Sequence, residues 1–138
     1  MTVQSSAPIS LLAFDPIAAA VTGSVGSTIN LGPVQALTLF ASFLYGAGGT
    51  TVKAWVQTSF DGGATWMDIA NFAFTTAAAK RAHHLTAPVN ATIVTPGDAT
   101  LGDGLLVNSF LGPLFRVKYT TTGTYSGASS LNIFGYAK

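Results

Sequence analysis

Residue types that commonly carry catalysis are scarce in this sequence. It holds five acidic residues, all aspartate, no cysteine, and two histidines that are adjacent, His83 and His84. Neighbouring side chains on a strand point to opposite faces, so two adjacent imidazoles are poorly placed to hold one metal ion. A tetrahedral zinc site also needs three or four converging ligands. We therefore predict no metal, no cofactor and no small-molecule substrate, and we expect exposed or interfacial histidines.

Most of the aspartates stand in turn contexts, where the side chain usually bonds its own backbone. These contexts are Asp15-Pro16, Asp61-Gly62, Gly97-Asp98 and Gly102-Asp103-Gly104. Glycoside hydrolysis would require two carboxylates within about 10 Å of each other in a cleft, and nothing in the spacing points to such a pair. The glycine-rich segments 46–49 and 102–104 lack the lysine or following helix of a phosphate-binding loop. We therefore predict that the protein is not an enzyme.

One local motif is recognisable at residues 59–66, which read SFDGGATW and match the Asp-box pattern S-x-D-x-G-x-T-W. In this pattern the aspartate caps a hairpin turn, glycine permits the turn backbone, and tryptophan packs beneath. In sialidase-like propellers the box recurs once per blade and lies away from the active site, whereas it occurs once here. We assign a structural turn role, in preference to contact with a sugar, to Ser59, Asp61, Gly62, Gly63, Thr65 and Trp66.

The distribution of turn residues predicts an all-β fold. Glycine, threonine, serine and proline interrupt the chain about every 8–12 residues, as in sandwiches and barrels. The clearest hairpin joins Thr50–Ser59 to Thr65–Phe74, with Met67 and Ile69 expected on the face opposite Phe72. Further strands are expected at 17–22, 27–31, 36–44, 81–86, 91–94, 104–110, 114–121 and 129–137.

The length and the strand pattern together predict one domain over residues 1–138. We expect an antiparallel, jelly-roll-like β-sandwich of about eight strands. Residues 1–14 contain apolar side chains without clear alternation, so we expect an extended arm there.

The composition is poor in charge. Charged residues make up 8% of the chain and apolar residues 49%, against about 25% charged in an ordinary soluble domain. Such a chain either buries much of its exterior in contacts or covers it with threonine, serine, glycine and alanine. The net charge of +1 disfavours nucleic-acid binding. The longest apolar stretch, Ala36–Tyr45, is too short to cross a membrane, and Met1–Ser10 does not resemble a secretion signal.

The segments Trp55–Ala70 and Leu114–Thr120 resemble small structural proteins of tailed bacteriophages. The resemblance implies a virion component on the capsid surface, made in the host bacterial cytoplasm. A cement or decoration protein of this kind would contact the major capsid protein and copies of itself, and a neck or tail subunit is the alternative. No catalytic residues are carried over. Expected contact elements are the N-terminal arm, Asp98–Gly104 and Ala77–His84.

A carbohydrate-binding module is a second reading, from a different class of function. It would need Trp55, Trp66, Tyr45 and Tyr125 to form an aromatic platform for stacking on sugars. The simpler alternative for Trp66 is a packing role beneath the Asp-box turn.

Overall fold

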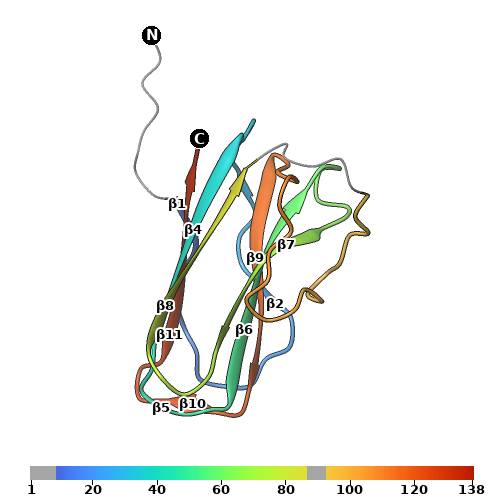
Figure 1. Cartoon of the computed structure of the whole chain (residues 1–138). Coiled ribbons are helices and arrows are strands. Elements are labelled where there is room, and N and C mark those ends of the chain that lie inside the picture. The colour runs from blue at the N-terminus through green and yellow to red at the C-terminus, as the bar shows by residue number, and fades with distance from the viewer. Residues whose placement is uncertain (1–8, 87–92) are drawn as a thin grey trace.

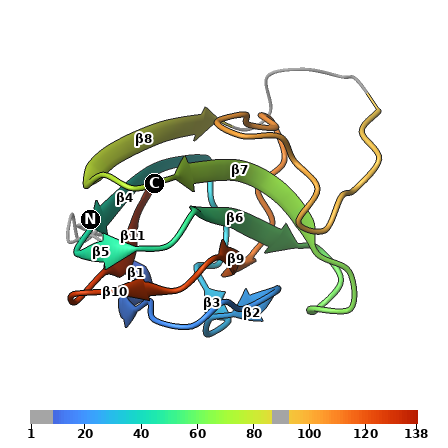
Figure 2. The same ribbon diagram turned by 90° about the horizontal axis from the view of Figure 1, so that it is seen from below.

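The computed structural model describes residues 9–86 and 93–138, except for the side chains of residues 13–15. The described residues form strands and no helix, arranged as two facing sheets (Figures 1 and 2). This confirms the predicted all-β, sandwich-like fold. The strands are β1 (Ile9–Pro16), β2 (Ser24–Val25), β3 (Ile29–Asn30), β4 (Ala36–Leu44), β5 (Ala47–Gly48), β6 (Thr51–Ser59), β7 (Met67–Phe74), β8 (Ala79–Thr86), β9 (Leu114–Thr122), β10 (Tyr125–Ser126) and β11 (Ser130–Ala137).

The first sheet, sheet A, has the order β1-β11-β4-β8. The second, sheet B, has the order β2-β9-β6-β7, and β3 also pairs with β9. The short strands β5 and β10 pair with each other at one end of the sandwich (Figure 1). Every pairing between these strands is antiparallel. The jelly-roll connectivity stays a prediction.

Alternation along the strands places the core between the two sheets. In β4, Leu37, Leu39 and Phe43 are almost fully buried, whereas Phe40 and Leu44 on the other face are exposed. Residues from both sheets form one buried apolar cluster. Its inner contacts include the stacked rings of Phe43 and Phe74, whose centroids lie 5.2 Å apart.

The N-terminal segment differs from the prediction. Ile9–Pro16 is not an arm, because it forms β1 and pairs with β11 at the edge of sheet A. Leu11 and Leu12 are both buried, which stabilises this pairing. Register shifts on either side of Leu12 explain why the sequence shows no clean alternation there. The remainder of the predicted arm, residues 1–8, lies outside the described residues.

Some predicted strands are irregular instead. Segment 17–22 has no strand, although Ile17 is buried, and 104–110 contributes only an isolated bridge between Leu106 and Ala70. Segment 27–31 shortens to β3. Residues 91 and 92 lie outside the described residues, and residues 93 and 94 are not in a strand.

A register shift in the hairpin also changes the faces of β7. Val56 pairs with Ala70 and Gln57 with Asp68, so Ile69 is an extra residue in β7. A bulge of this kind breaks the period of two. As a result Met67, Ile69, Ala70 and Phe72 all belong to the core, and the prediction that Met67 and Ile69 face away from Phe72 is wrong.

Replacing Phe43 by alanine should lower the free energy of unfolding by about 3–5 kcal/mol, because a buried ring is lost and a cavity remains. Phe40, three residues earlier on the same strand but 41% exposed, is the matched control. Phe40→Ala should change the same quantity by less than about 1 kcal/mol. Urea unfolding followed by tryptophan fluorescence measures both, and equal losses would contradict the assigned faces of β4.

Candidate functional site

The Asp-box residues lie in the turn between β6 and β7. The Ser59 hydroxyl donates to Asp61 Oδ1 (2.9 Å) and accepts from the Gly63 N–H (2.9 Å). The Thr65 N–H donates to Asp61 Oδ1 at 2.8 Å. These bonds to Thr65 and Ser59 hold the pKa of Asp61 below its usual value. Gly62 and Gly63 have φ of 73° and 95°, a region that glycine adopts without strain.

Trp66 packs under this turn but not in the core. A Cβ built on Gly63 would be 3.6 Å from the Trp66 ring, so ring and turn are in contact. On sheet B the Arg116 guanidinium lies over the same ring, 4.3 Å from its centroid. The ring is partly buried between the turn and this cation, outside the apolar core.

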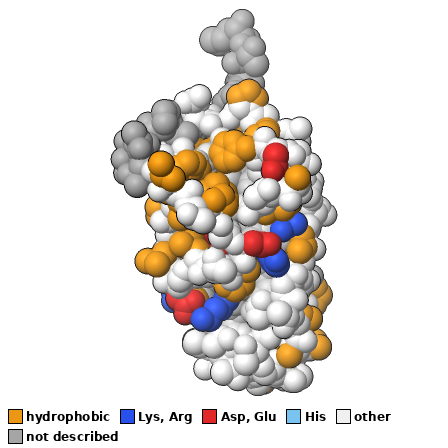
Figure 3. All heavy atoms as spheres, turned by 90° about the vertical axis from the view of Figure 1, so that its right-hand side faces the viewer, with side chains coloured by type: hydrophobic (Ala, Val, Ile, Leu, Met, Phe, Trp, Pro, Cys, Tyr) orange, Lys and Arg blue, Asp and Glu red, His pale blue; other side chains and the backbone are white. Residues whose placement is uncertain are grey.

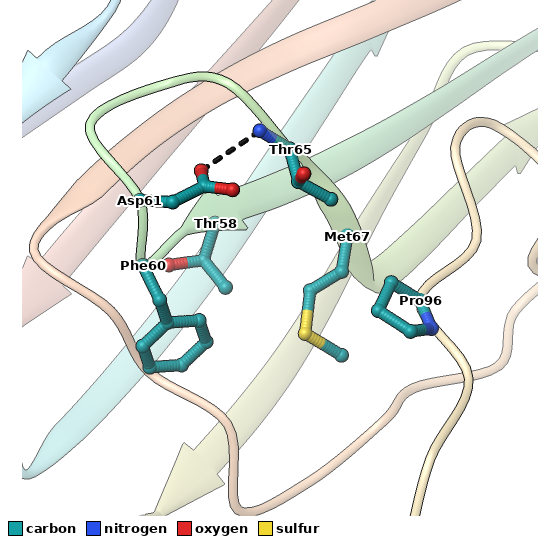
Figure 4. Close-up of a pocket in the computed structure, with 6 residues that line it drawn as sticks. All are labelled: Thr58, Phe60, Asp61, Thr65, Met67 and Pro96. Atoms are coloured by element: carbon teal, nitrogen blue, oxygen red, sulfur yellow. Dashed lines mark hydrogen bonds between the residues drawn. The ribbon is translucent and has the colours of Figure 1, made fainter.

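A shallow pocket lies beside the turn (Figure 4). Phe60, Met67 and Pro96 give it an apolar lining, with Thr58, Asp61 and Thr65 at its polar side. Asp61 accepts hydrogen bonds from the Ser59 hydroxyl and the Thr65 N–H, and its pKa is lowered. A carboxylate held in its ionised form is unsuited to act as a general acid.

A polar cluster covers the outer face of sheet B. The Gln57 amide nitrogen donates to both Asp68 Oδ1 (2.8 Å) and Asp98 Oδ1 (2.7 Å). Asp68, which is 3% exposed, also accepts from the backbone N–H groups of three consecutive residues. These are Ala99 (2.9 Å), Thr100 (2.8 Å) and Leu101 (3.1 Å). Asp68 thereby fastens residues 93–113, here called the covering loop, to β7.

Further bonds fix the covering loop along β6, β7 and β9. The Trp55 indole N–H donates to the Leu101 carbonyl at 2.8 Å, and the Gly104 N–H donates to Asn71 Oδ1 at 3.0 Å. Asp98 forms an ion pair with Lys118 (3.0 Å) and lies 4.0 Å from Arg116. The hydrogen bond from Gln57, followed by that from Lys118, lowers the pKa of Asp98.

The covering loop contains Asp98–Gly104, one of the expected contact elements, which is bonded to sheet B by Asp68 and Asn71. Two aspartates of this loop differ from their sequence prediction. Asp98 and Asp103 were expected to bond their own turns. Asp98 instead meets Gln57 and Lys118, and Asp103 pairs with Lys53 at 3.1 Å. Figure 3 shows acidic and basic side chains adjoining on this face.

The proximity of Asp68 and Asp98 was not expected from the sequence. Acid–base catalysis by a carboxylate pair needs one member with a raised pKa and access to solvent. Asp68 is buried and bonded to four N–H donor groups, and the pKa of Asp98 is lowered. The arrangement is therefore suited to holding a loop.

The two histidines point to opposite sides of β8. His83 Nε2 lies 3.0 Å from the Asn71 carbonyl oxygen, and His84 Nδ1 lies 2.9 Å from Thr38 Oγ1. Within residues 9–86 and 93–138, no three potential ligand side chains are grouped to hold a metal ion. The same part of the chain has no helix that is long and apolar enough to cross a membrane.

The four aromatic residues of the carbohydrate reading do not form one exposed platform. Tyr45 and Tyr125 are in edge contact with each other at the β5–β10 end, and Tyr125 is 1% exposed. Trp55 is 7% exposed and bonded to the covering loop. One face of the Trp66 ring is covered by the Arg116 guanidinium.

An exposed apolar surface lies on the opposite side of the molecule. On the outer face of sheet A, Phe40 pairs with Phe134 across β4 and β11, and Tyr136 is two residues further along β11. Phe40, Leu44 and Tyr136 are 41%, 45% and 39% exposed. We call these residues, with the half-buried Phe134, the sheet A patch. The signal for this outer face in the sequence is the alternation of residues 36–44.

Comparison with known proteins gives no relative: no family model, curated protein or solved structure matches the chain.

Replacing Asp68 by asparagine should loosen the covering loop, because an amide cannot accept from all four N–H donor groups as the carboxylate does. We expect faster amide hydrogen exchange at residues 99–101 and a loss of about 2–4 kcal/mol in unfolding free energy. The control is Asp103→Asn, which breaks an exposed ion pair and should cost less than about 1 kcal/mol. Unchanged exchange at 99–101 in the Asp68 variant would contradict this anchoring role.

Proposed function

We propose that this protein is a non-enzymatic structural component of a virion, and specifically a cement or decoration protein of a phage capsid. In this role it contacts the major capsid protein and copies of itself, and it stabilises the shell by burying surface across subunit joints. A neck or tail subunit is the alternative position within the same class.

The sheet A patch is the observation that best supports the proposal. Monomeric proteins rarely expose contiguous apolar surface, and large exposed patches commonly mark sites of protein contact. Phe40, Phe134 and Tyr136 lie on adjacent strands of a regular sheet. Aromatic side chains are enriched in protein interfaces because they bury a large area with few rotatable bonds.

The use of charge supports the same proposal. Three of the six cationic side chains, Lys53, Arg116 and Lys118, are paired with aspartates at the covering loop. The outer face of sheet A has only Lys80, at its edge, as a charged side chain on β4, β8 and β11. A face with so little charge loses little solvation energy when it is covered.

Copy number in purified particles of the encoding virus tests the position. Quantitative mass spectrometry should find hundreds of copies per particle for a capsid decoration protein. About a dozen copies or fewer would move the assignment to the neck or tail, since those parts contain small closed rings. Absence from the particles would overturn the virion role.

The sheet A patch can be tested on the purified protein. We expect the native chain to self-associate in sedimentation velocity at high concentration, and Phe40→Ser to shift it toward monomer by removing an exposed ring. Phe60→Ser is the matched control, because Phe60 is 58% exposed but lies on the β6–β7 turn. A native chain that stays monomeric and does not bind capsids, or equal effects of both variants, would contradict the proposed role of this face.

A further inference from the structure

The open edge of β8 has a regular hydrogen-bonding geometry. β8 ends the order of sheet A and pairs with β4 over eight consecutive residues without a register shift. The other long edges are obstructed, since β1 has two register shifts and ends at Pro16. The β7 edge is covered by backbone bonds from the covering loop, including Asn71 N–H to Leu105 and Val107 N–H to Ile69. A regular open edge is a template for adding another strand.

The backbone groups on this open edge can be assigned. The Thr86 N–H bonds the Asn108 side chain (2.8 Å), so it points away from β4. Backbone groups alternate along a strand, so those of His84, Ala82 and Lys80 point the same way. The hydrogen bond of the Lys80 carbonyl supports this orientation, because the carbonyl accepts from the exposed Arg81 side chain at 3.1 Å.

The β8 edge is also basic. Lys80 and Arg81 form no ion pair with any described residue, whereas Lys53, Arg116 and Lys118 all do. Arg81 lies over the Phe74 ring, 5.8 Å from its centroid. No aspartate side chain among those described therefore neutralises the positive charge at this edge.

A pocket opens between the β8 edge and β7. Its lining includes Arg81 and His83 from β8, Asn71 and Phe72 from β7, and Asp103 from the covering loop. Asn71 is fully buried, and its amide nitrogen has no hydrogen-bond partner among the described residues. The orientation of this amide is fixed, because its oxygen accepts from the Gly104 N–H. The nitrogen therefore remains as a donor that lacks an acceptor.

We propose that the β8 edge binds an extended acidic segment of another protein by strand addition. The backbone of that segment bonds Lys80, Ala82 and His84, and one of its carboxylates enters the pocket. There the carboxylate accepts from the Asn71 amide nitrogen and meets the Arg81 guanidinium. Buried donors without an acceptor are costly, so a carboxylate gains by filling this position. Asp103 at the pocket is already paired with Lys53, which limits its repulsion of the ligand.

The chemistry identifies the occupant as a different protein. Asp61, Asp68, Asp98 and Asp103 are all bonded within the chain, so a second copy offers no free acidic strand among the side chains described. The inference goes beyond the proposed virion role and does not require it. The binding groups are the backbone groups of β8 that point away from β4, whereas the self-association test depends on the Phe40 side chain, which stands on the outer face of sheet A beside Ala82.

The test uses a ten-residue peptide of alternating threonine and glutamate, labelled for fluorescence anisotropy. We expect saturable binding to the native protein, and at least about tenfold weaker binding of the peptide with glutamine in place of glutamate, equivalent to about 1.4 kcal/mol. A third peptide, with proline in place of each threonine, should not bind. The threonines carry the N–H groups that face β8 when the glutamates face Arg81, and proline has no N–H. In NMR spectra, the native complex should shift the amide signals of Lys80, Ala82 and His84 and the side-chain amide of Asn71.

Protein variants give the matching controls. Arg81→Gln should weaken binding of the glutamate peptide about tenfold, and Lys138→Gln, which removes the same charge elsewhere, should leave it unchanged. Ala82→Pro should abolish binding while keeping the fold, because the lost N–H points away from β4. Equal affinity for the glutamate and glutamine peptides would overturn the carboxylate pocket. Binding of the proline peptide, or no binding of any peptide, would overturn strand addition.

Discussion

The buried carboxylate of Asp68 determines how sheet B is covered. A buried charge is costly unless hydrogen bonds satisfy it, and here the satisfying donors are Gln57 and three backbone N–H groups of the covering loop. If the loop left, the carboxylate would keep only the Gln57 bond among these four. Trp55 depends on the same arrangement, since its N–H meets the Leu101 carbonyl next to the anchored residues. One side chain thus links the start of β7 to loop residues that follow it by 31 to 33 positions, beyond the reach of local sequence patterns.

The anchored loop also affects how the charged side chains are distributed over the surface. The ion pairs at Asp98 and Asp103 gather cations from β6 and β9 onto the covered face. In a chain with so few ionic residues, that leaves the outer face of β4, β8 and β11 almost uncharged. It also leaves Lys80 and Arg81 at the β8 edge without an ion pair to any described acid. Neither surface has an acidic partner from the covering loop, because Asp98 and Asp103 are paired with Lys118 and Lys53. Low charge in the sequence is therefore a better guide to the sheet A patch than to the whole exterior.

Strand alternation made the main strands predictable. The prediction for residues 36–44 coincides with β4, and the hairpin of β6 and β7 was placed within two residues at each end. Ile9–Pro16 was missed because two register shifts hide its period of two. The bulge at Ile69 caused the wrong faces in β7 for the same reason. The contacts of Asp68 with the covering loop could not be predicted, because they join side chains to backbone N–H groups and leave no periodic signal.

The two proposed contact surfaces are geometrically compatible. A partner on the sheet A patch approaches perpendicular to the sheet, whereas a strand added to β8 lies in its plane. A molecule with a single self-complementary face forms a closed pair and goes no further. A molecule that also binds an extended segment of a second protein can join that pair to a larger array. Face and edge together therefore provide two different directions of contact, one perpendicular to sheet A and one in its plane.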